Sequence, residues 1–150
     1  MTPMRLFHLI RSPLMATMLA LSLAHAHEAC QFNTIGAVAF GAYDVFSLVA
    51  TMGTGSIRIS SCSGAPFVAM LSTGNGGSYA PRTMLNGVNT LQYNLYKDAN
   101  RTVIWGDGSG GTATASSNGS TTFTVYGQIP AGQDAAAGVY ADSIVATITF

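Results

Sequence analysis

The sequence predicts an all-β fold, a sandwich of short strands, and three observations lead to it. No stretch after residue 26 keeps the 3.6-residue apolar period of an amphipathic helix. Apolar and polar residues alternate instead in several short segments, as they do in strands with one buried face. Clusters of Gly, Ser, Asn and Asp separate these segments, and all 17 glycines lie after residue 26. Short strands divided by such turn signals are typical of β-sandwiches.

Residues 1–26 have the composition of a secretory signal peptide. Two arginines stand near the start, and the uncharged apolar core, residues 14–24, is too short to span a bilayer. The last three residues read Ala-His-Ala, which is the pattern of a cleavage site. We therefore expect cleavage between Ala26 and His27 rather than an uncleaved anchor. The mature chain, residues 27–150, is then long enough for one domain.

Alternation predicts a strand with one apolar face in four segments. These are residues 56–60 (SIRIS), 91–96 (LQYNLY), 121–129 (TTFTVYGQI) and 142–150 (DSIVATITF). Their outer faces use Thr and Ser, and β-branched Thr packs well on a pleated surface. A fifth segment, residues 66–71 (PFVAML), is apolar on both faces, which predicts a central strand of the sandwich.

Residues 91–111 indicate a hairpin followed by a glycine-rich loop. The strand at 91–96 runs into a short charged turn, and a second strand ends on Trp105, the only Trp in the chain. Residues 106–122 are low in complexity, which predicts a flexible loop. Trp105 has two interpretations. It is either an anchor in the core, which we favour, or half of a platform that stacks on carbohydrate.

Cys30 and Cys62 are the only cysteines in the chain. An even pair in an exported chain is most simply one disulfide, and it would close a loop of about 33 residues. The alternatives are two metal thiolates or a redox pair. Two thiolates without a nearby His make a poor zinc site, and the spacing is far from Cys-x-x-Cys. We therefore expect a Cys30–Cys62 disulfide.

The mature chain carries few charges, with four Lys or Arg and six Asp or Glu, for a net charge of −2. A nucleic-acid-binding protein needs a basic patch to neutralise phosphates, and none is visible here. No segment after residue 26 is apolar enough to cross a bilayer. We therefore expect no nucleic-acid partner and no membrane-spanning segment in the mature chain.

Catalytic groups are scarce in this chain. Two of the three histidines leave with the signal peptide, and His27 becomes the first mature residue, which excludes Ser-His-Asp, Cys-His and most catalytic zinc sites. The pairs Asp98 with Asp107 and Asp134 with Asp142 flank loops, where Asp normally bonds to its own turn. The single Gly-Asp-Gly-Ser-Gly-Gly run supplies too few oxygens for calcium. We expect no enzyme activity, no metal site and no cofactor.

Five segments of the mature chain occur in an order known from one protein family. They are FGAYD (40–44), GSIRISSC (55–62), LQYNLYKDANRTVIWGDG (91–108), VYGQIPAGQ (125–133) and GVYADSIVATITF (138–150). In these segments the chain resembles the spore coat protein U domain family, which includes subunits of archaic, Csu-type chaperone–usher pili. The resemblance covers nearly the whole mature chain, so its domain is expected at residues 27–150.

The resemblance implies an immunoglobulin-like β-sandwich of the pilin type that lacks its final strand. In such subunits a periplasmic chaperone lends a strand to the open groove, and another subunit later replaces it by β-augmentation. The last strand borders this groove, which places Ile144, Ala146, Ile148 and Phe150 there. The implied partners are the periplasmic pilus chaperone, the outer-membrane usher and other pilus subunits. The implied location is the periplasm in transit and then the cell surface.

The resemblance also implies a structural or adhesive role, and the start of the mature chain refines it. Fibre-forming members carry a donor strand before the first cysteine. Here residues 27–29 precede Cys30, and three residues extend at most about 10 Å. We therefore expect a subunit that accepts a strand without giving one, at the tip of a fibre or as an accessory subunit.

The alternative function is a self-contained secreted module that binds carbohydrate or another surface. Its carbohydrate platform would combine Trp105 with Tyr79, Tyr93 or Tyr96, and it requires an exposed aromatic face. Burial of Trp105 would exclude the version that uses this residue.

Overall fold

The computed structural model describes residues 30–60, 62 and 64–150. The predicted signal peptide (1–26) and the expected cleavage point between Ala26 and His27 lie outside this part. Every regular element in the described residues is a strand, so the predicted all-β class is confirmed. The strands are β1 (Gln31–Ala39), β2 (Thr51–Ser60), β3 (Phe67–Leu71), β4 (Arg82–Asn86), β5 (Asn89–Tyr96), β6 (Ala115–Ser117), β7 (Thr121–Ile129) and β8 (Ala146–Thr149).

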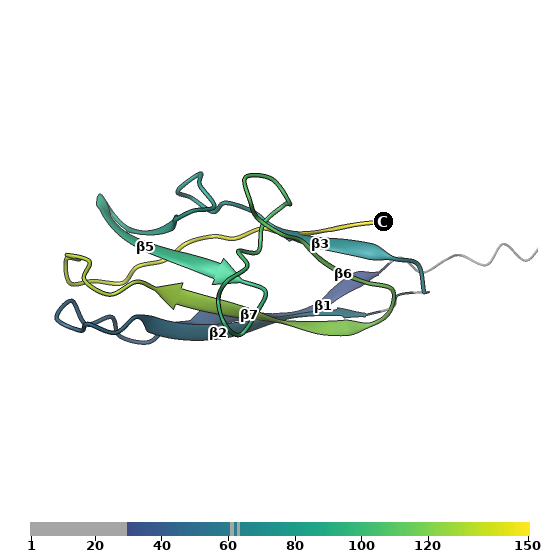
Figure 1. Cartoon of the computed structure of the whole chain (residues 1–150), viewed down its shortest axis with the longest axis horizontal. Helices are drawn as coiled ribbons and strands as arrows, with labels where there is room; N and C mark the ends of the chain where they lie inside the picture. Colours follow the sequence, from purple (N-terminus) through teal and green to yellow (C-terminus); the bar gives the residue numbers. More distant parts are fainter. Residues whose placement is uncertain (1–29, 61, 63) are drawn as a thin grey trace, which may run out of the picture.

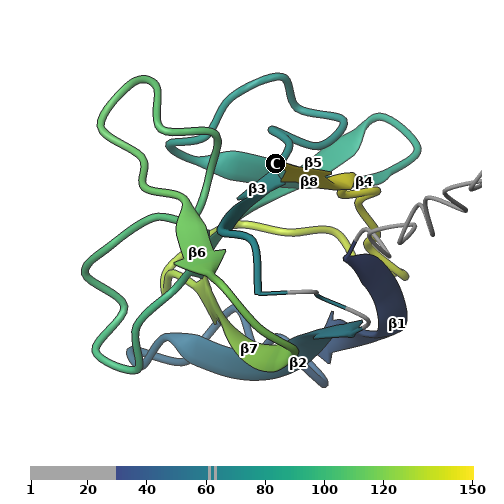
Figure 2. The same ribbon diagram turned by 90° about the vertical axis from the view of Figure 1, so that its right-hand side faces the viewer.

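The strands form two antiparallel sheets, seen along the molecule in Figure 1 and from one end in Figure 2. The larger sheet has the order β1-β2-β7-β5-β4, and the smaller has the order β6-β3-β8. The larger sheet curls, so that β4 and β5 lie near the smaller sheet while β1, β2 and β7 form the opposite layer (Figure 2). Side chains from both sheets fill the space between them, as expected for a sandwich.

The alternating segments of the sequence became strands with the predicted inner faces. In β2, Ile57 and Ile59 are buried while Arg58 points outward. β3 lies between β6 and β8, so the segment that is apolar on both faces is indeed a central strand. Its inner residues Phe67 and Leu71 are among the most buried in the chain, because the two sheets meet there.

The C-terminal segment is less regular than the sequence predicts, because it pairs with two partners in turn. Ala141 exchanges two backbone hydrogen bonds with Leu85 of β4, at 2.8 and 3.0 Å. The carbonyl of Val145 then accepts a hydrogen bond from the N–H of Ser72, 2.9 Å away, and β8 begins only at residue 146. The segment therefore crosses from the edge of the larger sheet to the smaller one.

Trp105 is an anchor in the core. Its side chain is fully buried, and its indole N–H donates to the carbonyl of Ala69 at 3.0 Å. The Phe123 ring meets it edge-on, 5.6 Å away. The second arm of the predicted hairpin is held by isolated bridges and is not a regular strand. This burial excludes the carbohydrate platform built on Trp105, and Tyr93 is buried as well.

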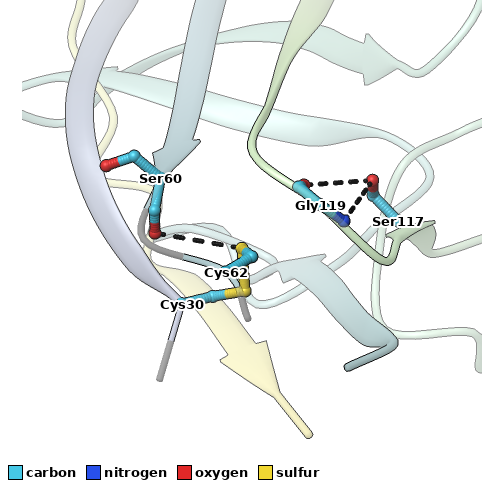
Figure 3. Close-up of a disulfide and its surroundings, with 5 residues drawn as sticks. All are labelled: Cys30, Ser60, Cys62, Ser117 and Gly119. Atoms are coloured by element: carbon cyan, nitrogen blue, oxygen red, sulfur yellow. Dashed lines mark hydrogen bonds between the residues drawn. A yellow bond between two sulfur atoms is a disulfide. The ribbon is translucent and has the colours of Figure 1, made fainter. Parts of the chain in front are cut away.

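The expected disulfide joins the two cysteines at one end of the sandwich (Figure 3). Cys30 immediately precedes β1, and Cys62 follows the end of β2, with their Cα atoms 4.3 Å apart. The bond therefore ties β1, an edge strand of the larger sheet, to its neighbour β2. β1 is fixed at this end, and its far half lies beside the groove described next.

Candidate functional site, an apolar groove between the sheets

A groove of about 1070 Å³ lies between β1 and the C-terminal segment. One wall is the second half of β1 with the chain that follows it, residues 35–46. The other wall is the chain from residue 135 to residue 146. The floor is the hydrophobic core itself, with contributions from Ile57, Leu71, Met84, Leu91, Tyr93, Leu95, Val125 and Ile129. The groove therefore opens the interior of the sandwich along one side.

Both sheets end at this groove. β1 is the last strand of the larger sheet, and β8 is the last strand of the smaller one. Within the described part of the chain, each of these strands is paired along one edge alone, β1 with β2 and β8 with β3. An edge strand presents a row of backbone N–H and C=O groups that can pair with another strand. The groove thus combines an apolar floor with two open sheet edges.

Polar groups at the groove are occupied by bonds within the chain. Asp44 and Asp142 are the charged residues among those that line it. A carboxylate oxygen of Asp44 accepts from the N–H of Phe46 at 2.9 Å. Asp142 accepts from the N–H of Asn75 at 2.7 Å and from the hydroxyl of Tyr93 at 2.6 Å. The surface left for a ligand is therefore mainly apolar side chains and backbone.

The environment of Tyr93 keeps its hydroxyl protonated. Burial is the main cause that raises its pKa, and the hydrogen bond to Asp142 raises it further. The hydroxyl therefore stays a donor to Asp142 at physiological pH, and it holds the C-terminal wall against the floor.

The structure places two of the four residues expected at the groove in its lining. Ile144 and Ala146 line it, whereas Ile148 packs against the core beyond the groove and Phe150 is 69% exposed. As the alternation predicts, Ile144, Ala146 and Ile148 face inward, and the pattern ends before Phe150. Whether all four residues contact a partner strand stays a prediction.

No pattern in the sequence predicted the opposite wall of the groove. Ile35 and Val38 of β1 line it together with Phe40, the residue after β1, but register shifts after Phe32 and after Gly36 disturb the two-residue period there. A simple search for alternation fails across such bulges. The run of apolar and small residues after Cys30 is the signal that could have identified this wall.

The carboxylates of Asp98 and Asp107 accept hydrogen bonds within their own loops. Asp98 accepts from the N–H groups of Thr102 and Val103, and Asp107 accepts from the N–H and hydroxyl of Ser109. The bond from Val103 is the main cause that lowers the pKa of Asp98, and the Ser109 hydroxyl is the main cause for Asp107. Across residues 30–60, 62 and 64–150, no three His, Cys, Asp or Glu side chains are placed to hold a metal ion. In the same part of the chain, no helix is long and apolar enough to cross a membrane.

The fold and the groove define a β-sandwich subunit with two open strand edges. The family model of the Spore Coat Protein U domain matches residues 15–147, and the chain belongs to this family. It is 36% identical over 131 residues to "Protein U" of Myxococcus xanthus, a match that covers 77% of this chain and 72% of that protein. The family predicted from the five sequence segments is therefore confirmed.

A solved structure with a similar fold supports the pilin-type architecture. It is the crystal structure of the CsuC–CsuE chaperone–tip adhesion subunit pre-assembly complex from archaic chaperone–usher Csu pili of Acinetobacter baumannii. The TM-score is 0.54 at 21% sequence identity, and the match covers 81% of this chain. This chain spans 39% of the length of the matched chain. The likeness concerns the fold of the matched part.

Proposed function

We propose that this protein is a structural subunit of a surface polymer, a pilus or coat of the chaperone–usher type. It would enter the polymer by accepting a β-strand from another chain. The observation that carries this proposal is the groove, where an apolar floor lies between two open sheet edges. In β-augmentation, backbone hydrogen bonds along the edges give affinity, and alternate side chains fill apolar pockets.

The dimensions of the groove suit a strand. Its wall from Ile35 of β1 to Phe40, the residue after β1, spans six residues, which corresponds to roughly 20 Å of extended chain. A strand of that length turns about three side chains toward the floor, because successive side chains point to opposite faces. Apolar side chains would bury against Leu91, Val125 and Ile129, and each buried side chain of Val or Leu size contributes about 1.5–3 kcal/mol.

The partners in this proposal are a periplasmic pilus chaperone, which would fill the groove before assembly, the outer-membrane usher, and other pilus subunits. The signal peptide predicted at residues 1–26 and the disulfide agree with export to an oxidising compartment. A terminal or accessory place in the polymer is the finer part of the proposal. It rests on cleavage after Ala26, which N-terminal sequencing of the exported protein would check.

Co-expression tests the proposal. The full chain, with its own N-terminal segment, is produced with and without the periplasmic chaperone from the same genome, and the products are separated by size-exclusion chromatography. We expect a one-to-one complex with the chaperone and aggregation without it. A stable, soluble monomer in the absence of the chaperone would show that the groove needs no strand from another chain, and the proposal would fail.

A second candidate function, adhesion to an apolar surface, is favoured by the loops at one end of the molecule. Phe46 and Leu48 lie between β1 and β2, Val88 lies in the turn between β4 and β5, and Val139 lies between β7 and β8. Each is at least 86% exposed. The three connections gather at the end away from the C-terminus, on the left in Figure 1. Replacing Leu48 and Val88 by Ser, neither of which lines the groove, should reduce retention on hydrophobic beads while chaperone binding is kept.

A further inference from the structure

Three glycines form a depression in the inner face of the larger sheet. Gly53 of β2 lies directly opposite Gly127 of β7, and Gly55 lies two residues further along β2. By strand alternation they share the inner face with Ile57 and Val125, where other positions carry large apolar side chains. We call Gly53, Gly55 and Gly127 the glycine cradle.

Two side chains at the end of β1, Val38 within the strand and Phe40 directly after it, occupy the space that a Cβ would need in the cradle. A Cβ on Gly127 would lie 2.5 Å from the Phe40 ring and 2.6 Å from a methyl carbon of Val38. A Cβ on Gly53 would lie 2.9 Å from the same ring and 2.7 Å from the carbonyl oxygen of Ala39. These distances are too short for real contacts, so the ring position of Phe40 depends on glycine beneath it.

Phe40 is the first of three side chains in contact that cross the groove floor. Its ring meets the Tyr93 ring edge-on, with 5.9 Å between the centroids and 77° between the planes. The Tyr93 hydroxyl then donates to Asp142 on the opposite wall. Phe40, Tyr93 and Asp142 therefore connect the two walls, and all three line the groove.

We propose that Phe40, seated on the glycine cradle, determines the size of the side chain that an incoming strand can carry at the point where that strand passes over the Phe40 ring. The proposal rests on the strand-accepting function proposed above. Inward side chains of a strand are about 6.6–6.8 Å apart, so a strand that fills the groove places one of them over the Phe40 ring. Interiors are close-packed, and extra methylenes over a fixed ring force strain. A small side chain fits over Phe40, and a large one is rejected.

The experiment measures which peptides the full chain retains. The probes are nine-residue peptides that alternate Thr and Val, in which each Val in turn is replaced by Gly or by Phe. Each fluorescent peptide is added to the full chain during refolding, and the amount that co-elutes in size-exclusion chromatography is measured by titration. For the wild type we expect one position at which Gly is retained at least tenfold better than Phe.

Changes to Phe40 and to the cradle separate this role from a general effect on folding. Phe40→Ala should reverse the preference at that position, so that Phe is retained better than Gly. Gly127→Ala should displace the ring and weaken retention of every peptide, and combining it with both Phe40→Ala and Val38→Ala, which removes the two side chains that the new Cβ would meet, should restore it. Gly119→Ala is the matched control, because a Cβ there meets nothing within 4 Å.

The outcomes distinguish this proposal from the function on which it rests. If wild type and Phe40→Ala both retain peptides with the same preference at every position, the role of Phe40 is refuted while strand acceptance stands. Failure of the triple variant to recover what Gly127→Ala loses would also refute it. If the wild type retains none of the peptides, strand acceptance itself fails, and the role of Phe40 fails with it.

Discussion

Arg82 is fully buried, and its guanidinium holds three parts of the chain together. It donates two hydrogen bonds to the carbonyl of Ser72, one to the side chain of Asn94 and one to the carbonyl of Trp105, at 2.7–3.1 Å. The Tyr79 ring covers it, 5.1 Å from the centroid. Burial lowers the pKa of Arg82, as desolvation of a cation does. No pattern in the sequence indicated this role, since an Arg at the start of a strand normally faces water.

Replacing Arg82 by Met should remove about 3 kcal/mol or more from the free energy of unfolding. The carbonyls of Ser72 and Trp105 would lose the donors that Arg82 supplies, while the Asn94 side-chain oxygen would keep the N–H of Leu95. An unsatisfied buried acceptor costs about 1–3 kcal/mol. Urea denaturation of the full chain with a donor peptide bound would measure this change. Arg58→Met is the control, because Arg58 is exposed in β2 of the same sheet, and it should change stability by less than about 0.5 kcal/mol. Equal effects of the two substitutions would contradict this account of Arg82.

Tyr93 should make the protein sensitive to alkali. Its folded-state pKa is raised above the unfolded value of 10.0, chiefly by burial, so its contribution to stability is complete below about pH 10 and is lost as the pH rises above that. Tyr93→Phe removes the group that titrates. We expect the thermal midpoint of the variant to depend less on pH between about 10 and 12 than that of the wild type. If the thermal midpoints of the wild type and the variant fall equally with pH in this range, Tyr93 is not the source of the alkali sensitivity.

At the scale of elements, sequence patterns predicted the strands whose environment is uniform. β2, β3, β5 and β7 keep one register against their neighbours in the core, so period 2 or a continuous apolar run identified them. β1 and β4 escaped the period search for different reasons. β1 contains two register shifts, and β4 begins with a buried Arg and ends in a polar turn.

Only the C-terminal wall of the groove was predicted, because only that wall has a regular alternation in the sequence. Ile144 and Ala146 lie in a regular alternation that reaches the groove, and the family resemblance gave that alternation a role. The opposite wall, formed by β1 and the chain after it, depends on register shifts in β1 that bring Val38 and Phe40 against the glycine cradle. Such long-range placement is set by strand pairing and glycine packing, which no local pattern reports.

A charge in the groove wall should block strand acceptance. Ala146→Asp places a carboxylate where apolar side chains meet, and burying it without a partner is unfavourable. We expect recovery of the chaperone complex to fall at least tenfold in a pull-down from the periplasm. Thr147→Asp, one residue further on the exposed face of β8, is the matched control and should behave like the wild type. Unchanged binding by Ala146→Asp would show that this wall is not used.

For the whole molecule, the disulfide should contribute much of the stability of the open sandwich. It closes a loop of about 33 residues, for which the loss of chain entropy corresponds to roughly 3–4 kcal/mol. Replacing both Cys30 and Cys62 by Ser should lower the free energy of unfolding by this amount in urea denaturation. Reductant should weaken the wild type to the same level and leave the double variant unchanged. A double variant as stable as the oxidised wild type would contradict this expectation.

The central claim is that the groove receives a strand from another polypeptide chain. Site-specific photo-crosslinking in the exporting cell tests it most directly, with benzoylphenylalanine placed at Ile35, which lines the groove and is 58% exposed. The control position is Val103, which is 37% exposed and lies outside the groove lining. We predict that Ile35 crosslinks to a chaperone or a second subunit through an extended segment that mass spectrometry can identify, and that Val103 does not. Crosslinking from Ile35 at no more than the level of Val103 would contradict the account.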